Sequence, residues 1–265
     1  MWRLWGMAAL LAVCSCATKH YRVTSVERSR ILVDKRYDAV PSQAAQAFMA
    51  PYKQRIDSLM SPVVGQAASY LYATGPESPL SNLLPDVLMW GAQRYGERPD
   101  FAIYNIGGMR AAFAAGDVTV GDVLDVAPFE NKICFVTLTG EQVLELFGQI
   151  ASSYGEGVSR GIELVIEPDG RLRSARLNGK EFEKDAKYRI ATIDYVAQGN
   201  DKMVAFKKAT DVNSPQEESN NVRYLIMDYF REKAGRGEAV DARIEGRITV
   251  VANPDGETGG ISRGN

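Results

Sequence analysis

Histidine is almost absent from this sequence, since among 265 residues it occurs once, as His20. A nucleophile of the Ser-His or Cys-His type needs an imidazole inside a folded site, so such a system is excluded. A catalytic pair of transition metals is excluded as well, because imidazole ligands suit such metals. The net charge of −2 argues against a nucleic-acid groove or a polybasic membrane patch. We therefore predict no catalytic residue and no metal ligand in this chain.

Long apolar runs are also missing. The run Leu4–Val13 is too short for a helix that crosses a bilayer, and with Arg3 before it the pattern predicts a secretory signal. The signal ends in Val13-Cys14-Ser15-Cys16, which resembles a bacterial lipoprotein cleavage box with Cys16 as the lipid-bearing residue. A plain cleaved signal is the alternative. We expect residues 1–16 to be a lipoprotein signal peptide and the mature chain to be exported and lipid-anchored to a bacterial membrane, periplasmic or at the cell surface.

Cysteine is scarce too, and beyond Cys16 only Cys134 remains. This count excludes an internal disulfide framework. Cys134 lies within the apolar run from residue 133 to residue 138, so we predict that it is a small buried hydrophobic residue.

Hydrophobic periodicity divides the rest of the chain. Residues 17–40 are polar and basic, and we predict that they form a tether with a short strand around residues 30–33. We predict one domain over residues 41–252. The tail, residues 253–265, is predicted to be disordered. Helical spacing indicates helices at 42–60, with Pro51 inside, and at 78–91, 141–154 and 220–233. Strand-like runs lie at 63–72, 101–104, 133–138, 162–166, 171–177, 188–196 and 244–251, and residues 207–219 read as a loop. This uneven alternation predicts an α+β fold, a mixed β-sheet with packed helices.

A polar turn, Asn105-Ile106-Gly107-Gly108-Met109-Arg110, follows the apolar run 101–104. Adjacent glycines allow another group to approach the backbone closely. Asn105 offers a donor and an acceptor, and Arg110 offers a rigid fork of donors. These groups suit a small polar or anionic ligand. The alternative is a tight turn at the end of a strand, with a surface arginine.

A second turn, Pro128-Phe129-Glu130-Asn131, precedes the apolar run 133–138. A phenylalanine in a loop can stack on a planar ring, at about 1–3 kcal/mol per stacked base. The alternative is that Phe129 packs into the core.

Several short motifs occur together in one order. They are Asn105-x-Gly-Gly-x-Arg110, Gly116-Asp117-Val118-Thr119, Pro128-Phe129-x-Asn131, Leu138-Thr139-Gly140, Val158-Ser159-Arg160-Gly161, Tyr188-Arg189-Ile190-Ala191-Thr192 and Gly199-Asn200-Asp201-Lys202-Met203. In this order and spacing the chain resembles the C-terminal, substrate-binding domain of the 5′-nucleotidase family, from about Glu77 to Phe206. The resemblance implies the fold of that domain.

In that family the C-terminal domain binds the nucleoside between two aromatic rings, and an Asn and an Arg contact polar groups. The resemblance implies that Asn105, Arg110 and Phe129 take these roles in substrate binding. It places Met203 where the second ring should stand, with Tyr195 as an alternative ring. It also implies that Asp201 accepts hydrogen bonds from ribose and that Asn82 contacts the ligand near these loops, although Asn82 and Asp86, four residues apart, could instead be a surface pair.

The metal-binding domain of the family has no counterpart upstream of residue 77. The resemblance therefore implies the nucleotide- or nucleoside-recognition half of a split 5′-nucleotidase, whose divalent metals lie on a separate metallophosphatase chain, with no cofactor in this one. The alternatives are a lipoprotein that binds nucleotides or nucleosides without turnover and a domain retained as a structural or interaction surface. The expected partners are a nucleotide or nucleoside ligand, a metallophosphatase subunit and a membrane reached through the lipid anchor, with no nucleic acid.

Overall fold

The computed structural model describes residues 21–37 and 42–252, which divide into two compact units at Pro51 and Tyr52. In the first unit, residues 21–34 have no regular secondary structure, and the 3-10 helix η1 spans Lys35–Tyr37. The short strand predicted around residues 30–33 is wrong. Ile31 and Val33 are exposed, and a strand without a pairing partner or a buried face is not stable.

Helix α2, Gln43–Met60, matches the predicted helix and contains Pro51, and it has no buried residue. The residues that form α2 belong to both units. Within the part of the chain that the structure describes, no helix combines the length and the apolar character that a membrane crossing requires.

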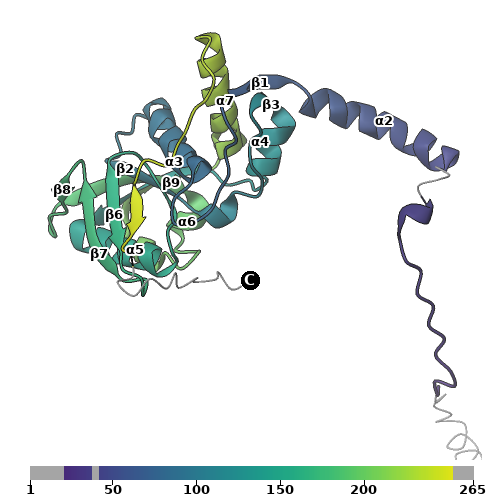
Figure 1. Ribbon diagram of the computed structural model, residues 1–265, viewed down its shortest axis with the longest axis horizontal. Helices are drawn as coiled ribbons and strands as arrows, with labels where there is room; N and C mark the ends of the chain where they lie inside the picture. Colours follow the sequence, from purple (N-terminus) through teal and green to yellow (C-terminus); the bar gives the residue numbers. More distant parts are fainter. Residues whose placement is uncertain (1–20, 38–41, 253–265) are drawn as a thin grey trace, which may run out of the picture. The chain divides into compact units, whose positions relative to one another are not determined.

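The second unit is built on three sheets (Figure 1). The five-stranded sheet has the order β10-β4-β9-β2-β5, formed by Thr210–Asn213, Ile133–Thr139, Lys187–Ile193, Phe101–Tyr104 and Gly157–Val158. The four-stranded sheet has the order β11-β6-β7-β8, formed by Ile248–Val250, Ile162–Ile166, Leu172–Leu177 and Lys180–Glu181. A two-stranded sheet pairs β1, Val63–Ala67, with β3, Gly116–Thr119.

The strand pairing in the five-stranded sheet is mixed. Strands β4 and β9 are antiparallel, with Ile133 opposite Ile193 and Thr139 opposite Lys187, whereas β2 runs parallel to β9. Because of these directions, β2 and β9 end, and β4 begins, at the same side of the sheet. The mixed sheets and packed helices confirm the predicted α+β class.

Five α-helices of the second unit follow α2 in the chain (Figure 1). They are α3, Pro79–Gly91; α4, Val120–Val126; α5, Gly140–Ser152; α6, Asp194–Ala197; and α7, Val222–Gly235. Short 3-10 helices are η2, Ala92–Tyr95; η3, Ile106–Gly108; η4, Val204–Lys208; and η5, Glu218–Asn220. The helices predicted around residues 78–91, 141–154 and 220–233 are therefore present, with boundaries shifted by a few residues.

The core lies among these sheets and helices. Phe101 and Phe147 meet at 5.6 Å between ring centroids, and Phe182 joins both. Cys134 is 1% exposed, which confirms the prediction of a buried hydrophobic residue. Burial also raises the pKa of its thiol above the ordinary value.

Three predicted strands are shorter than expected. The run 63–72 is a strand only to Ala67, the run 244–251 only from Ile248 to Val250, and the run 188–196 becomes helix α6 after Ile193. In the last case Val196 is buried on a helical turn, and an apolar run of this length does not distinguish strand from helix. The predicted loop at 207–219 holds β10 and η5.

Helix α4 has no counterpart among the predicted elements. It begins with a capping box, in which Asp122 N–H donates to Thr119 Oγ1 at 3.1 Å and Thr119 N–H donates to Asp122 Oδ2 at 2.7 Å. A threonine followed three residues later by an acidic residue is a recognisable helix start. The helix spans seven residues, which is too short for its apolar period to stand out.

Candidate functional site

Asn105 is the buried centre of the first turn, residues 105–110, at the end of β2. Its side chain is 2% exposed, and its Nδ2 donates to Asp201 Oδ2 at 2.5 Å. The next backbone amide, from Ile106, donates to the buried carboxylate of Glu156, also at 2.5 Å. Hydrogen bonds to an ionised acceptor are roughly twice as strong as neutral ones. The first turn therefore holds Asn105 in one orientation, against a loop 96 residues further along the chain.

Asp201 connects this turn to an aromatic ring. Its backbone has a positive φ of 51°, and its Oδ1 accepts a hydrogen bond from the Tyr195 hydroxyl at 3.1 Å. Partial burial, and then the negative charge of Asp201, raise the pKa of Tyr195 above its ordinary value. The hydroxyl is therefore protonated at neutral pH and donates. Asn105, Asp201 and Tyr195 form a continuous hydrogen-bonded series that ends at a ring 39% exposed.

The carbonyl oxygen of Asn105 is a buried acceptor without a partner. In the described residues the side-chain oxygen Oδ1 of Asn105 accepts no hydrogen bond. A buried polar group left unpaired costs about 1–3 kcal/mol. The turn therefore lacks one donor that a ligand could supply.

Phe129 is 49% exposed, so it is not a residue of the buried core. The second turn, residues 128–131, is held from two sides. Arg223 Nη2 donates to the Pro128 carbonyl at 2.9 Å. Lys132 N–H, directly after the turn, donates to Asp194 Oδ1 at 3.1 Å. Because Asp194 precedes Tyr195, the second turn lies beside the loop that carries the other exposed ring.

Arg110 joins the first turn to the second. Its backbone N–H donates to the Val126 carbonyl at 2.9 Å, two residues before Pro128. Its side chain is exposed and makes one hydrogen bond, to the Gly107 carbonyl at 3.3 Å. Among the described residues it pairs with no carboxylate, so its charge is available to an anionic or polar ligand.

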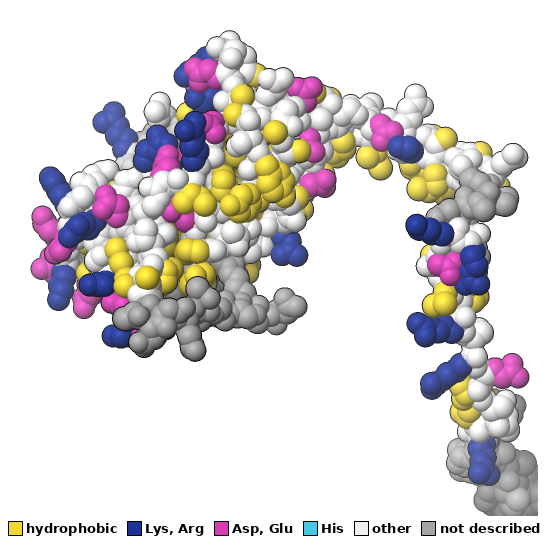
Figure 2. All heavy atoms as spheres, in the orientation of Figure 1, with side chains coloured by type: hydrophobic (Ala, Val, Ile, Leu, Met, Phe, Trp, Pro, Cys, Tyr) yellow, Lys and Arg dark blue, Asp and Glu magenta, His cyan; other side chains and the backbone are white. Residues whose placement is uncertain are grey.

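These contacts link the first turn, the second turn and the loop of Tyr195 and Asp201 to one another. On the face that Figure 2 draws, hydrophobic side chains gather in the region of α4 and α6, among the charged surface around them. Exposed rings beside fixed polar groups are the composition of a small-molecule site.

Met203 and Asn82 are both buried. Met203 is 1% exposed and belongs to the hydrophobic core, so it offers a ligand almost no surface. Asn82, at 2% exposure, is not half of a surface pair: its Nδ2 donates to Glu77 Oε1 at 2.6 Å and to the Arg243 carbonyl at 2.8 Å. Their roles in ligand binding remain predictions from the resemblance. Tyr195 is exposed, whereas Met203 is not. In the sequence, the indication that Tyr195 could be the second ring is its position as an aromatic residue shortly before Asp201.

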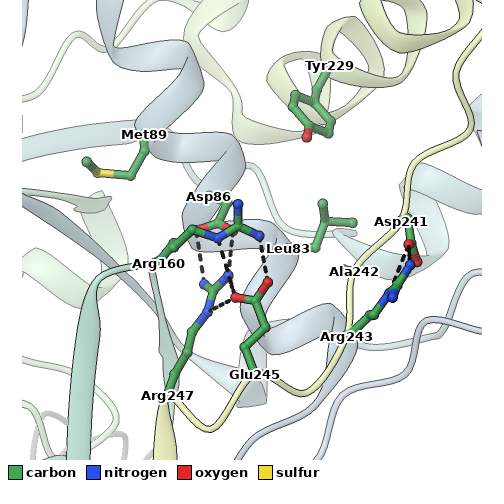
Figure 3. Close-up of a pocket in the computed structure, with 10 residues that line it drawn as sticks. All are labelled: Leu83, Asp86, Met89, Arg160, Tyr229, Asp241, Ala242, Arg243, Glu245 and Arg247. Carbon is green, nitrogen blue, oxygen red and sulfur yellow. Dashed lines mark hydrogen bonds and ion pairs between the residues drawn. The ribbon is translucent and has the colours of Figure 1, made fainter. Parts of the chain in front are cut away.

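Asn82 lies next to a second polar cluster, formed by residues of α3 and of the segment 241–247. Residues of this cluster line a cavity of about 390 Å³ (Figure 3). Arg247, whose side chain is 4% exposed, donates from Nη2 to Asp86 Oδ2 and to Glu245 Oε2, both at 2.7 Å. Arg160 approaches Glu245 from the other side at 2.6 Å. Burial raises the pKa of Glu245, but the hydrogen bonds from Arg160 and Arg247 outweigh it, so the pKa is lowered overall. The side chains of the cluster pair with one another and tie α3 to the segment 241–247.

Metal ligands do not gather in the described part of the protein. Across residues 21–37 and 42–252, no group of three His, Cys, Asp or Glu side chains is arranged to hold a metal ion. His20 and the predicted lipidation residue Cys16 lie outside the described residues.

This chain is similar to parts of two longer bacterial enzymes, a nucleotide phosphoesterase and a 5′-nucleotidase. It is 30% identical over 194 residues to the trifunctional nucleotide phosphoesterase protein YfkN of Bacillus subtilis, which is 67% of this chain and 13% of YfkN. It is 34% identical over 118 residues to a 5′-nucleotidase of Vibrio cholerae, which is 43% of this chain and 21% of that enzyme. The matched part of the chain is therefore a small fraction of each relative.

A solved structure resembles the fold over a longer stretch. The 5′-nucleotidase precursor of Thermus thermophilus superposes with a TM-score of 0.68 at 26% identity, covering 82% of this chain and 45% of that protein. The family model described as "5′-nucleotidase, C-terminal domain" matches residues 63–208, more than half of the chain. This stretch contains the first turn, the second turn and the loop of Tyr195 and Asp201. The chain belongs to the 5′-nucleotidase C-terminal domain family.

Proposed function

We propose that this chain is the nucleotide- or nucleoside-recognition half of a split 5′-nucleotidase, anchored outside the cytoplasm through a lipid on Cys16. The observation that carries the proposal is the hydrogen-bonded series Asn105–Asp201–Tyr195 beside the exposed ring of Phe129. A base can stack on the rings of Phe129 and Tyr195. Asn105 Oδ1 can accept from the base or the sugar, and Asp201 can accept from ribose hydroxyls.

Hydrolysis of the phosphate ester is assigned to a separate chain. The described residues do not offer the donor set for a pair of divalent metals, and the sequence has a single histidine. The relatives are several times longer than the stretch they share with this chain. A metallophosphatase that is exported as well and lacks a C-terminal domain of its own would supply the metals.

An activity assay of the purified mature chain tests whether hydrolysis requires a separate metallophosphatase chain. We expect no hydrolysis of AMP by this chain with added Mg²⁺, Mn²⁺ or Zn²⁺, because residues 21–37 and 42–252 hold no cluster of ligands for a two-metal site. Co-expression with a metallophosphatase of the kind described should restore hydrolysis of AMP. Metal-dependent turnover that stays with the single chain through repurification would contradict the split.

Replacing the exposed ring tests the base-binding role. Phe129→Ala should weaken adenosine binding by about 1–3 kcal/mol, or roughly 5- to 150-fold in Kd, measured by calorimetry, because one stacking face is lost. Tyr70→Ala is the matched control, since Tyr70 is an exposed aromatic residue outside the site. Equal affinity of the wild type and Phe129→Ala, with both folded, would remove this ring from the site. If the wild-type chain binds adenosine but no combination with a metallophosphatase hydrolyses AMP, the alternative of a lipoprotein that binds nucleosides without turnover would be favoured.

The spacing of the first turn gives another prediction. A Cβ on Gly108 would lie 2.8 Å from Asn105 Oδ1, so Gly108→Ala should displace the Asn105 side chain and break its bond to Asp201. We expect adenosine affinity to fall by about tenfold, the value of one strong hydrogen bond, with the fold retained. Gly148→Ala, where a Cβ meets nothing within 4 Å, should bind like the wild type. An unchanged Kd for Gly108→Ala would mean that Asn105 does not contact the nucleoside.

A further inference from the structure

We propose that the cavity beside the second turn is a phosphate subsite, which binds a phosphate group attached to the nucleoside held by Phe129 and Tyr195. The cavity has a volume of about 340 Å³, and the side chains of Lys132, Arg223, Glu130, Glu218 and Tyr224 help to line it. The inference rests on the proposed function and extends it, since it names the anionic part of the ligand and the residues that bind it.

The cavity adjoins the nucleoside site through its two cations. Arg223 donates from Nη2 to the carbonyl of Pro128, the residue before Phe129. Lys132 donates its backbone N–H to Asp194, the residue before Tyr195. The cavity residues Arg223 and Lys132 therefore contact the residues next to Phe129 and Tyr195. A ligand that stacks on either ring would lie beside this cavity.

The charge of Arg223 also acts on Tyr104, the last residue of β2. Burial raises the pKa of the Tyr104 hydroxyl, and the positive charge of Arg223 acts against this rise. Tyr104 directly precedes Asn105. The positive charge of Arg223 thus reaches the end of β2, after which the first turn begins.

The two cations of the cavity lack acidic partners. In the described residues the Arg223 side chain bonds only to the Pro128 carbonyl, and its Nε is buried with no acceptor. Lys132 Nζ has a carbonyl oxygen of Glu130 at 3.4 Å and no carboxylate. Most other arginines of the second unit are in ion pairs, Arg94, Arg160, Arg189 and Arg247 among them. Unpaired cations that line a cavity favour an anion.

The acidic side chains of the cavity oppose this only weakly. Glu130 and Glu218 are exposed, and Glu218 accepts from the Tyr224 hydroxyl at 3.3 Å. Charges at the surface are screened by water and salt, whereas the half-buried guanidinium of Arg223 is screened less. The field inside the cavity is therefore set more by Arg223 than by the carboxylates.

The ligand chemistry follows from the donors. A guanidinium fork and an ammonium group are the usual partners of a phosphate. The phosphate has two possible sources: the 5′-phosphate of a mononucleotide, or a further phosphate, as in a 3′-nucleotide or a dinucleotide. Both present the same anion to Lys132 and Arg223, so the experiment separates them.

The test compares the affinities of adenosine, AMP, adenosine 3′-monophosphate and diadenosine diphosphate for the folded chain by calorimetry. We expect at least one phosphorylated ligand to bind roughly tenfold or more tightly than adenosine, the value of a charge-assisted hydrogen bond, and less so at higher salt. Lys132→Gln and Arg223→Gln should each reduce this advantage to less than about threefold. Lys132→Gln keeps the backbone bond to Asp194 and should leave adenosine affinity unchanged. Lys180→Gln, an exposed change on β8, is the matched control.

The pattern of gains identifies the source of the phosphate. A gain for AMP assigns the cavity to the 5′-phosphate, and a gain confined to the other two ligands assigns it to a further phosphate. No advantage for any phosphorylated ligand, or an advantage that survives both substitutions, overturns the subsite and leaves the nucleoside site intact. Failure of adenosine and all three phosphorylated ligands to bind the folded chain overturns the proposed function and the subsite together.

Discussion

Arg247→Met should lower the free energy of unfolding by about 3 kcal/mol, because the Asp86 carboxylate and the buried Val158 carbonyl both lose a buried donor. Arg247 is 4% exposed and bonds to two carboxylates, on Asp86 and Glu245. Its Nη1 also donates to the Val158 carbonyl at 2.8 Å. Methionine fills part of the same volume without replacing any of these donors. Urea denaturation of both proteins at pH 7 measures the difference.

The control for this prediction is Arg243→Met, four residues earlier. Arg243 pairs with Asp241, but its side chain is 79% exposed, so water and salt replace most of what the pair contributes. We expect a much smaller change than for Arg247→Met. Similar losses for the two variants would mean that the buried cluster of α3 and the C-terminal segment is not a major source of stability.

Gly140→Ala should destabilise the domain by about 3 kcal/mol, at the upper end of what overpacking usually costs. A Cβ on Gly140 would lie 2.0 Å from the Glu183 carbonyl oxygen and 2.7 Å from its carbon. These are backbone atoms, which cannot turn aside as a flexible side chain does. The start of α5 must therefore move away from the segment before β9, and the thermal midpoint should fall accordingly.

A second glycine of the same helix provides the contrast. Gly148 lies inside α5, and a Cβ there meets nothing within 4 Å. Gly148→Ala should stabilise the protein by about 0.5–1 kcal/mol, since alanine favours a helix over glycine by that amount. If both alanine variants were destabilised equally, the close approach of Gly140 to Glu183 would not be the reason.

The motif Leu138-Thr139-Gly140 shows what the order of motifs in the sequence could reveal. The order indicated the family and the α+β fold, which the structure and the family match support. It did not distinguish residues that pack from residues that face a ligand. Thr139 caps α5 by accepting from Gln142 N–H, and Gly140 permits a close backbone contact, so this motif is explained by packing.

Met203 and Tyr195 show why one site residue was hard to choose from the sequence. Both lie in the stretch between β9 and η4, and an apolar or aromatic side chain can be buried or exposed there. Tyr195 lies on the short helix α6 and is 39% exposed, while Met203 lies in the loop after α6 and is 1% exposed. Periodicity cannot resolve a helix of four residues, so the exposure of each side chain was visible only in the folded chain.

Arg247 and Arg223 were not predicted for a different reason. The bond from Arg247 to Asp86 spans 161 residues, and the bond from Arg223 to Pro128 spans 95. No local pattern marks such pairs, because each depends on how distant segments pack. The candidate phosphate subsite could therefore not be predicted from the sequence, because it depends on the packing of Arg223 against the distant second turn.

Calorimetric titration of adenosine and AMP into the folded mature chain, alongside Asn105→Ala and Phe129→Ala, tests the recognition site most directly. The wild type should bind at least one of the two ligands, and each substitution should weaken that binding by roughly tenfold or more, through loss of a polar contact or a stacking face. A folded chain that binds neither ligand, or that binds them with the same affinity after both substitutions, would contradict nucleoside recognition by the turns of Asn105 and Phe129.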